Sequence, residues 1–165
     1  MALEPAITDL ELLKERPELA RLLAWNASAV EGAKFDRNEL SIYIERTCLR
    51  EACITLKNDP ELNYDALVDV TCVDRTPNDP RFEVIYHLFS TVSKKRVRLK
   101  VRLSGDDARL DSLTPIWPGA NFFEREVFDL FGVRFQEHPN LKRILMPDNW
   151  EGHPLRKDYP VEGYR

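Results

Sequence analysis

Apolar and polar residues alternate along several stretches of this chain, which is the pattern of β-strands that bury one face. The clearest alternation covers residues 94–103, and similar patterns cover residues 39–45 and 64–73. Residues 82–91 are apolar on both faces, which favours a central strand. Residues 29–35 show a weaker pattern and are a candidate hairpin partner for 39–45. The pattern therefore predicts a sheet of about four strands.

Helical spacing of apolar residues marks three further regions. Between about residues 8 and 26 we predict two short helices. The first is expected to start with a Thr8-x-x-Glu11 capping box, and the second can start at Pro17. Residues 47–57 repeat apolar side chains at helical spacing and end before an Asn-Asp-Pro sequence, which predicts a helix covering one sheet face.

After a polar connection at residues 104–115, a last helix is predicted from Pro118 to Phe131, with Gly132 in the left-handed position that often ends a helix. Its expected buried face consists of Phe123, Val127, Leu130 and Phe131. Together the elements predict an α+β domain over residues 1–135, a mostly antiparallel sheet with helices packed on it.

Residues 136–165 lack sustained periodicity, and a segment of this length without regular structure is often functional. It still carries regularly interspersed apolar residues, including Leu145, Trp150 and Leu155, which it could not bury well alone. We therefore predict an extended C-terminal interaction arm that lies along another protein. We expect residues 1–135 to fold without this arm.

Composition and charge narrow the class of protein. The chain is 43% hydrophobic and 32% charged, with a net charge of −4, which argues against a dedicated nucleic-acid binder. No apolar run is long enough to span a bilayer, and the N-terminal residues do not resemble a secretory leader. The three cysteines, Cys48, Cys53 and Cys72, lack metal-ligand spacing and are expected to be reduced packing residues.

The charged face of residues 94–103 has three interpretations. Its cations are Lys94, Arg96, Arg98, Lys100 and Arg102. A solvated face of an antiparallel sheet explains them most simply, and a docking surface for an acidic partner explains them next. Nucleic acid is disfavoured because no aromatic residues interleave with the cations.

Acidic and histidine side chains gather around the last helix and the arm. Because successive helix residues turn by about 100°, Glu126 and Asp129 share a face while Glu124 points elsewhere, so the three are not expected to form one site. His138 and His153 each precede a proline and lack metal-ligand spacing. A small metal-dependent enzyme using Asp129, His138 and His153 remains an alternative of a different class. Arg125 and Asp129 are four residues apart and can pair.

The same region carries a long motif of mixed residue types. It runs through Glu124-Arg125-Glu126-x-x-Asp129-Leu130-Phe131, His138, Lys142-Arg143-Ile144-Leu145-Met146-Pro147, Trp150 and Gly152-His153-Pro154-Leu155-Arg156-Lys157-Asp158-Tyr159-Pro160. In these residues the chain resembles the 30-kDa subunit family of respiratory complex I, which includes the C-type subunit of bacterial NADH:quinone oxidoreductase and the J-type subunit of the cyanobacterial and plastid complex. Phe122-Phe123 departs from the Trp that many members have here.

The resemblance implies a non-catalytic structural subunit of the hydrophilic arm of a proton-translocating NADH:quinone oxidoreductase, at the cytoplasmic face of the bacterial inner membrane. It implies no cofactor on this chain, while the whole complex uses FMN, iron–sulfur clusters, NADH and quinone. The implied partners are the 49-kDa-type subunit and neighbouring iron–sulfur subunits, with the membrane reached only through the complex. The equivalent subunit of a membrane-bound hydrogenase or another cofactor dehydrogenase is the alternative.

The resemblance also suggests roles for the motif. Glu124, Arg125 and Asp129 would hold the corner between the last helix and the arm. The residues carried over as motif or subunit-interface positions are Glu124, Arg125, Glu126, Asp129, His138, Lys142, Arg143, Trp150, His153, Arg156, Lys157 and Asp158.

Overall fold

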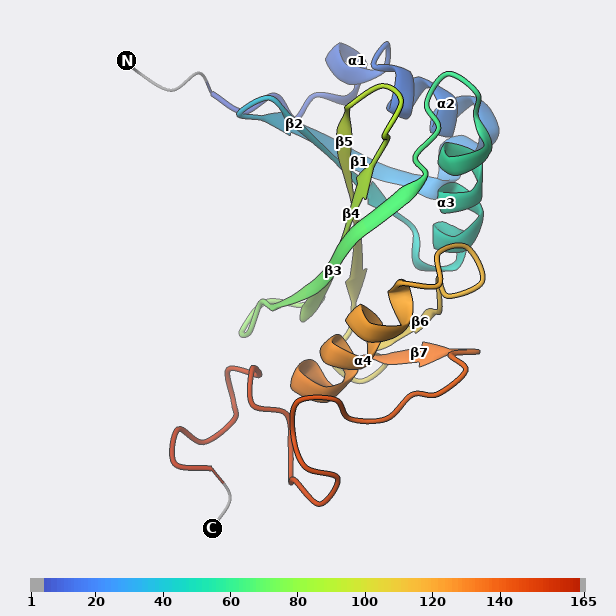
Figure 1. Ribbon diagram of the computed structural model, residues 1–165. Helices are drawn as coiled ribbons and strands as arrows, with labels where there is room; N and C mark the ends of the chain where they lie inside the picture. The colour runs from blue at the N-terminus through green and yellow to red at the C-terminus, as the bar shows by residue number, and fades with distance from the viewer. Residues whose placement is uncertain (1–4, 164–165) are drawn as a thin grey trace. The chain divides into compact units, whose positions relative to one another are not determined.

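A computed structural model describes residues 5–163, so residues 1–4 and the last two residues of the predicted arm lie outside the described part. The chain divides into two compact units. The first consists of Met1–Val68 with Tyr86–Val101, and the second of Asp69–Ile85 with Arg102–Arg165 (Figure 1).

The main sheet has five strands in the order β1-β2-β5-β4-β3. The strands are β1 (Val30–Asp36), β2 (Glu39–Ile44), β3 (Ala66–Asp74), β4 (Phe82–Phe89) and β5 (Arg96–Leu103). β1 and β2 form an antiparallel hairpin, whereas β2 and β5 run parallel. The sheet is mixed and mostly antiparallel, so the predicted α+β class is confirmed. The fifth strand is the weakly predicted partner at residues 29–35.

The first unit buries the faces that strand alternation predicts. Ile42 and Ile44 of β2 and Leu99 of β5 are fully buried. Three α-helices, α1 (Leu10–Leu13), α2 (Pro17–Asn26) and α3 (Leu49–Asn58), and the 3₁₀ turns Ala27–Ala29 and Arg46–Cys48 complete the unit. Helix α2 packs against α3 and β1 (Figure 1).

The first helix is capped differently from the prediction. Asp9, not Thr8, is the N-cap of α1, and its carboxylate accepts a hydrogen bond from the Glu11 N–H at 2.9 Å. Either side chain could cap a helix, and the backbone course selects the one that can reach a free N–H of the first turn. Pro17 begins α2, as predicted.

The second unit contains α4 (Ala120–Phe131) and a small parallel sheet of β6 (Arg109–Asp111) and β7 (Arg134–Gln136), which lies beside the helix (Figure 1). Gly119 is the N-cap of α4, so the helix starts two residues after Pro118. The small sheet was not predicted, because each strand has only three residues.

Strand β3 departs from its predicted face at one position. Val70 and Cys72 are buried, but Val68 is 44% exposed. The cysteines are free, with Cys53 and Cys72 buried and Cys48 half-buried, as expected for packing residues. None of the helices in residues 5–163 is long and apolar enough to cross a bilayer.

Candidate functional site

Helix α4 buries two carboxylates together with its apolar face. Val127, Leu130 and Phe131 are buried as predicted, and Phe123 is half-buried. Glu124 and Asp129 are each 0% exposed. Because buried charges are costly unless they are hydrogen-bonded or paired, the partners of these two side chains show what the helix is built to hold.

The Asp129 carboxylate is surrounded by the start of the arm. Its Oδ2 accepts hydrogen bonds from the backbone N–H groups of Ile144, Leu145 and Met146, at 3.0, 2.8 and 2.8 Å. Its Oδ1 accepts from Arg143 Nη1 at 2.6 Å. Burial by itself would raise the pKa of Asp129, but these hydrogen bonds outweigh it and hold the pKa below its ordinary value. Asp129 is therefore ionised and fixes the arm to the helix.

Two arginines reinforce this junction. Arg125 Nε and Nη2 donate to the carbonyls of Lys142 and Arg143, at 3.1 and 2.9 Å. Arg143 Nη2 donates to the carbonyls of Trp150 and Gly152, both at 2.9 Å. The expected Arg125–Asp129 pair was therefore wrong: Asp129 pairs with Arg143, because a tertiary partner reaches the buried carboxylate.

The arm also caps the C-terminus of α4. A helix leaves its last four carbonyls without partners inside the helix. The Phe128 carbonyl accepts from the Gly132 N–H, and the Leu130 carbonyl accepts from the Leu155 N–H at 3.0 Å. His153 Nδ1 donates to the Asp129 carbonyl at 2.9 Å, and Arg156 Nε to the Phe131 carbonyl at 2.6 Å. All four carbonyls are thus satisfied, three of them by the arm.

Gly132 makes this capping possible in two ways. Its φ of 75° is the left-handed conformation expected from the sequence. A Cβ at this position would also lie 2.6 Å from the His153 ring and still closer to Arg156. Only glycine lets the two arm side chains approach the helix end this closely.

Glu124 faces a different segment. Its oxygens accept hydrogen bonds from Ser112 Oγ at 2.6 Å and from the Leu113 N–H at 2.7 Å. His138 Nε2 lies 4.0 Å from Glu124 and donates to the Asn121 carbonyl at 3.2 Å, while its Nδ1 accepts from the Asn140 N–H. These contacts fix a neutral histidine, and burial lowers its pKa.

A second cluster fixes the far part of the arm. Arg81 bridges Asp74 and Asp158, with Nη2 at 2.8 and 2.7 Å from their oxygens, and the Lys157 N–H donates to Asp74 at 2.9 Å. Burial would raise the pKa of Asp74, but hydrogen bonds from Arg81 and Thr76 bring it far below its ordinary value. Sequence reasoning missed Asp74 and Arg81. The sequence did contain an indication of Asp74: this acid lies on the same face of the β3 strand as the buried Val70 and Cys72.

The remaining motif residues are more open. Glu126, Lys142 and Trp150 are exposed. Several apolar side chains of the arm also remain outside: Ile144, Leu145, Trp150, Leu155 and Val161. The arm is therefore attached through its polar groups while much of its apolar surface faces outward.

No metal set forms from the predicted candidates. The Asp129 carboxylate is occupied by Arg143 and backbone N–H groups, and His153 contacts the Asp129 carbonyl instead. Within residues 5–163, no group of three or more His, Cys, Asp or Glu side chains is placed to hold a metal ion. The arrangement is suited to holding a segment in place.

The fold and the site thus define a class of protein: an α+β chain whose C-terminal segment is clamped onto its last helix. A family model described as "Respiratory-chain NADH dehydrogenase, 30 Kd subunit" matches residues 42–165. The chain belongs to this family, the 30-kDa subunits of complex I, and it is of the C type found in NADH-quinone oxidoreductase.

Individual relatives agree with this assignment. The C-type subunit of NADH-quinone oxidoreductase from Roseiflexus castenholzii is 47% identical over 143 residues, covering 87% of this chain and 82% of the relative. The protein of the same name from Caulobacter sp. is 39% identical over 160 residues, covering 97% of this chain and 72% of the relative.

Two solved structures are similar as well. A trypsin-resistant fragment (1-134) of Nqo5 aligns with a TM-score of 0.64 and 31% identity, covering 75% of this chain and 99% of that one. A chain of the membrane-bound sulfane sulfur reductase, an archaeal respiratory membrane complex, aligns with a TM-score of 0.71 and 27% identity, covering 87% and 85%.

Proposed function

We propose that this chain holds neighbouring subunits together in a proton-translocating NADH:quinone oxidoreductase and contributes no catalytic group of its own. The observation that carries the proposal is the family match over residues 42–165, which includes the whole clamped arm. Membership of a multisubunit respiratory complex follows from the relatives. The clamp gives that role a physical basis, since it presents a fixed surface to partners.

The exposed apolar residues of the arm are the proposed contact surface. Leu145 is 54% exposed and Leu155 is 52% exposed, although the backbone beside each is hydrogen-bonded to α4. Apolar side chains held outward on an ordered segment favour a protein partner, because a partner removes them from water without further ordering cost. We infer that the partners are the 49-kDa-type subunit and neighbouring iron–sulfur subunits.

In this proposal the motif residues act in two ways. Asp129, Arg143, His153 and Arg156 position the arm, and Trp150 with the exposed leucines contacts a partner. FMN, iron–sulfur clusters, NADH and quinone are bound by other subunits. The chain reaches the cytoplasmic face of the inner membrane through those subunits.

Co-purification tests the proposal. The chain, tagged at its native locus, is expected to emerge from gently solubilised membranes together with the quinone-reducing subunits. If it emerges alone, the proposal is wrong. A Leu145→Asp/Leu155→Asp variant should lower the recovery of the complex, whereas Leu12→Asp, at a residue 71% exposed on α1, should not.

The second candidate is the equivalent subunit of another membrane-bound respiratory enzyme, which the archaeal match favours. The higher identity of 47% to an NADH-quinone oxidoreductase subunit supports the first candidate. The proteins that co-purify decide between them: an NADH-oxidising subunit in the complex supports the first and its absence the second.

A further inference from the structure

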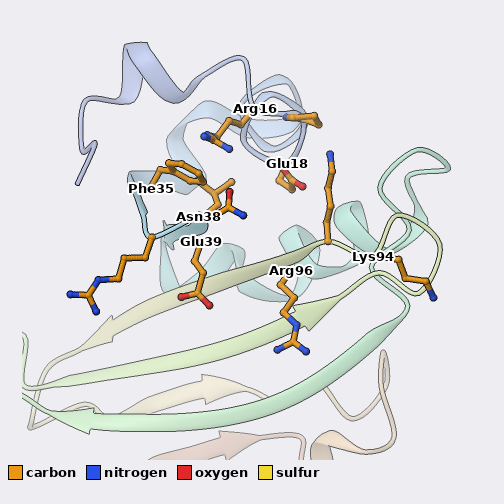
Figure 2. Close-up of a pocket in the computed structure, with 11 residues that line it drawn as sticks. Arg16, Glu18, Phe35, Asn38, Glu39, Lys94 and Arg96 are labelled. Atoms are coloured by element: carbon orange, nitrogen blue, oxygen red, sulfur yellow. The ribbon is translucent and has the colours of Figure 1, made fainter. Parts of the chain in front are cut away.

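The first unit contains a pocket of about 500 Å³ that is lined mainly by charged and polar residues (Figure 2). Three places build it: the residues around the start of α2, the β1–β2 turn and the β4–β5 turn. Its cations are Arg16, Arg37, Lys94, Lys95 and Arg96. All five cations belong to the first unit, whereas α4 and the arm belong to the second. We call this pocket the basic pocket.

The sheet topology explains why the cations of two turns lie at one end of the sheet. Strands β2 and β5 are parallel neighbours with Leu40 opposite Val97, so both strands begin at the same end of the sheet. The turn before β2 contains Arg37, and the turn before β5 contains Lys94 and Lys95. Both turns therefore place their cations beside one hollow.

The backbone at these cations is unusual. Arg37 has φ of 51°, Asn38 has φ of 64° and Lys94 has φ of 57°. This left-handed region is uncommon for residues other than glycine, asparagine and aspartate. Arg37 and Asn38 form the two-residue turn of the β1–β2 hairpin, and such turns favour positive φ at both positions. The hairpin therefore fixes Arg37 at the tip of its turn.

The cations that line the basic pocket outnumber the carboxylates that line it, five to two. Its two carboxylates already have partners, since Glu18 accepts from Tyr64 Oη at 2.7 Å and Glu39 pairs with Arg98. Arg37 and Lys94 interact electrostatically with Asp36 and Asp65, but the direct partners of those two carboxylates are Lys34 and Thr91.

The other two cations of the pocket rest on aromatic rings. The Arg16 guanidinium lies 3.4 Å from the centre of the Phe35 ring, beside the hollow (Figure 2), and Arg96 lies 5.6 Å from that of Phe89. Stacking holds a guanidinium in place without using its N–H groups. These arginines therefore keep donors for a carboxylate.

We propose that the basic pocket binds an acidic segment of a neighbouring subunit, through at least two Asp or Glu carboxylates. The inference rests on the proposed function, because it requires the chain to sit in a complex. Eight of the eleven residues that line the pocket are charged or polar and five of them are cations, which favours an anionic ligand. Guanidinium groups bind carboxylates in a bidentate manner, which favours Asp and Glu as the contacting residues.

The contact goes beyond what the family match implies. The match covers residues 42–165, whereas Arg16, Phe35 and Arg37 precede it. The basic pocket thus contains residues of the matched region, at the start of β5, and residues that precede that region. The proposal assigns a partner to this cationic end of β5.

Zero-length cross-linking of the intact purified complex tests the proposal. A water-soluble carbodiimide joins a lysine amine only to a carboxylate in contact with it. Lys94 or Lys95 is expected to link to an acidic peptide of another subunit, identified by mass spectrometry. The Lys34–Asp36 pair within this chain, at 2.8 Å, is the internal control that the reagent reaches the first unit.

Charge reversal gives the second measurement. An Arg37→Glu/Lys95→Glu variant is expected to weaken retention of the chain in the complex by about tenfold, with the largest loss at low salt, where charge pairs are least screened. An Arg109→Glu/Arg134→Glu variant changes the same number of exposed charges on the small sheet and is the matched control. Equal retention of both variants would overturn the proposal.

The outcomes separate this proposal from the preceding one. If the wild-type chain does not co-purify with a complex, the proposed function fails. If it co-purifies but Lys94 and Lys95 link only to carboxylates of this chain or to none, the basic pocket proposal alone fails. Protection of both lysines from acetylation in the complex without any carboxylate link would indicate a lipid headgroup and would also overturn it.

Discussion

Asp129 connects sequence, fold and function at a single side chain. It lies on a helix whose neighbouring positions bury apolar residues, yet it is fully buried as an anion. Three consecutive backbone N–H groups and one guanidinium surround it. Such a carboxylate stabilises one conformation of the arm, because no other arrangement would satisfy it as well.

Replacing Asp129 with asparagine should therefore destabilise the chain. The neutral amide cannot form an ion pair with Arg143, and its single oxygen cannot accept both from Arg143 and from the three backbone N–H groups, so donors are left unpaired. We expect a loss of about 3 kcal/mol in the free energy of unfolding, measured by urea denaturation of the isolated chain. Glu126→Gln, at an exposed position of the same helix, should stay within about 0.5 kcal/mol of wild type. Equal effects of the two substitutions would contradict the clamp.

The two arm histidines predict a pH dependence. Burial lowers the pKa of both His138 and His153 below 6.5 in the folded chain. Below about pH 6.5 the unfolded chain then binds more protons than the folded one, so stability should fall as the pH falls through this window. Urea unfolding at about pH 7.5 and about pH 5.5 measures the difference. A His138→Gln/His153→Gln variant should show a smaller difference, and an unchanged one would refute the assignment.

Helix α4 ends in a way that depends on residues far along the chain. Its last turn has carbonyls that the arm satisfies, and Gly132 supplies the space for His153 and Arg156. Cationic groups at a helix C-terminus are also favoured by the helix dipole. The helix and the arm therefore form one element of stability within the second unit.

A pair of glycine substitutions separates backbone conformation from packing. Gly163 has φ of 73°, close to the 75° of Gly132, but a Cβ there would meet only Tyr159 Oη at 3.6 Å. Gly163→Ala should therefore show only the backbone cost, about 1–2 kcal/mol at most. Gly132→Ala should cost more and make the arm sensitive to protease, since the added methyl group displaces His153 and Arg156. Similar effects of both substitutions would show that the close approach is unimportant.

Across the whole chain, the two units carry different proposed contacts. The first unit has the basic pocket, and the second has the clamped arm with its exposed apolar side chains. Contacts through charge and contacts through apolar burial respond differently to salt, because screening weakens the first while apolar burial is not screened. Assembly of the complex should depend on both.

Deletion of residues 137–165 tests how far the arm contributes to folding. The truncated chain would lack the partners of Asp129 and of three helix carbonyls, so we expect fast hydrogen exchange in the last turn of α4 and slow exchange in α2 and α3. Deletion of residues 161–165 leaves those partners in place and is the control. Equal protection of α4 in both truncated chains would mean that residues 1–135 are complete without the arm.

Most of the secondary structure could be predicted from the sequence, because it follows from local periodicity. The alternation of β5 and the glycine after α4 correspond directly to a buried sheet face and a left-handed helix end. Short elements such as β6 and β7 could not be predicted, because three residues contain too little pattern. The motif residues could be found from the resemblance to the family, but the resemblance did not show which residues they contact.

The sequence by itself determined the α+β class, the faces of most strands, the end of α4 and the family. These depend on spacing, capping and a motif that are properties of neighbouring residues. Only the tertiary structure decided that Asp129 binds Arg143 instead of Arg125, that Glu124 binds the segment at Ser112, and that the cations of two turns line one pocket. Each of these contacts joins residues distant in the chain, and a local pattern carries no information on which distant partner will reach a buried charge.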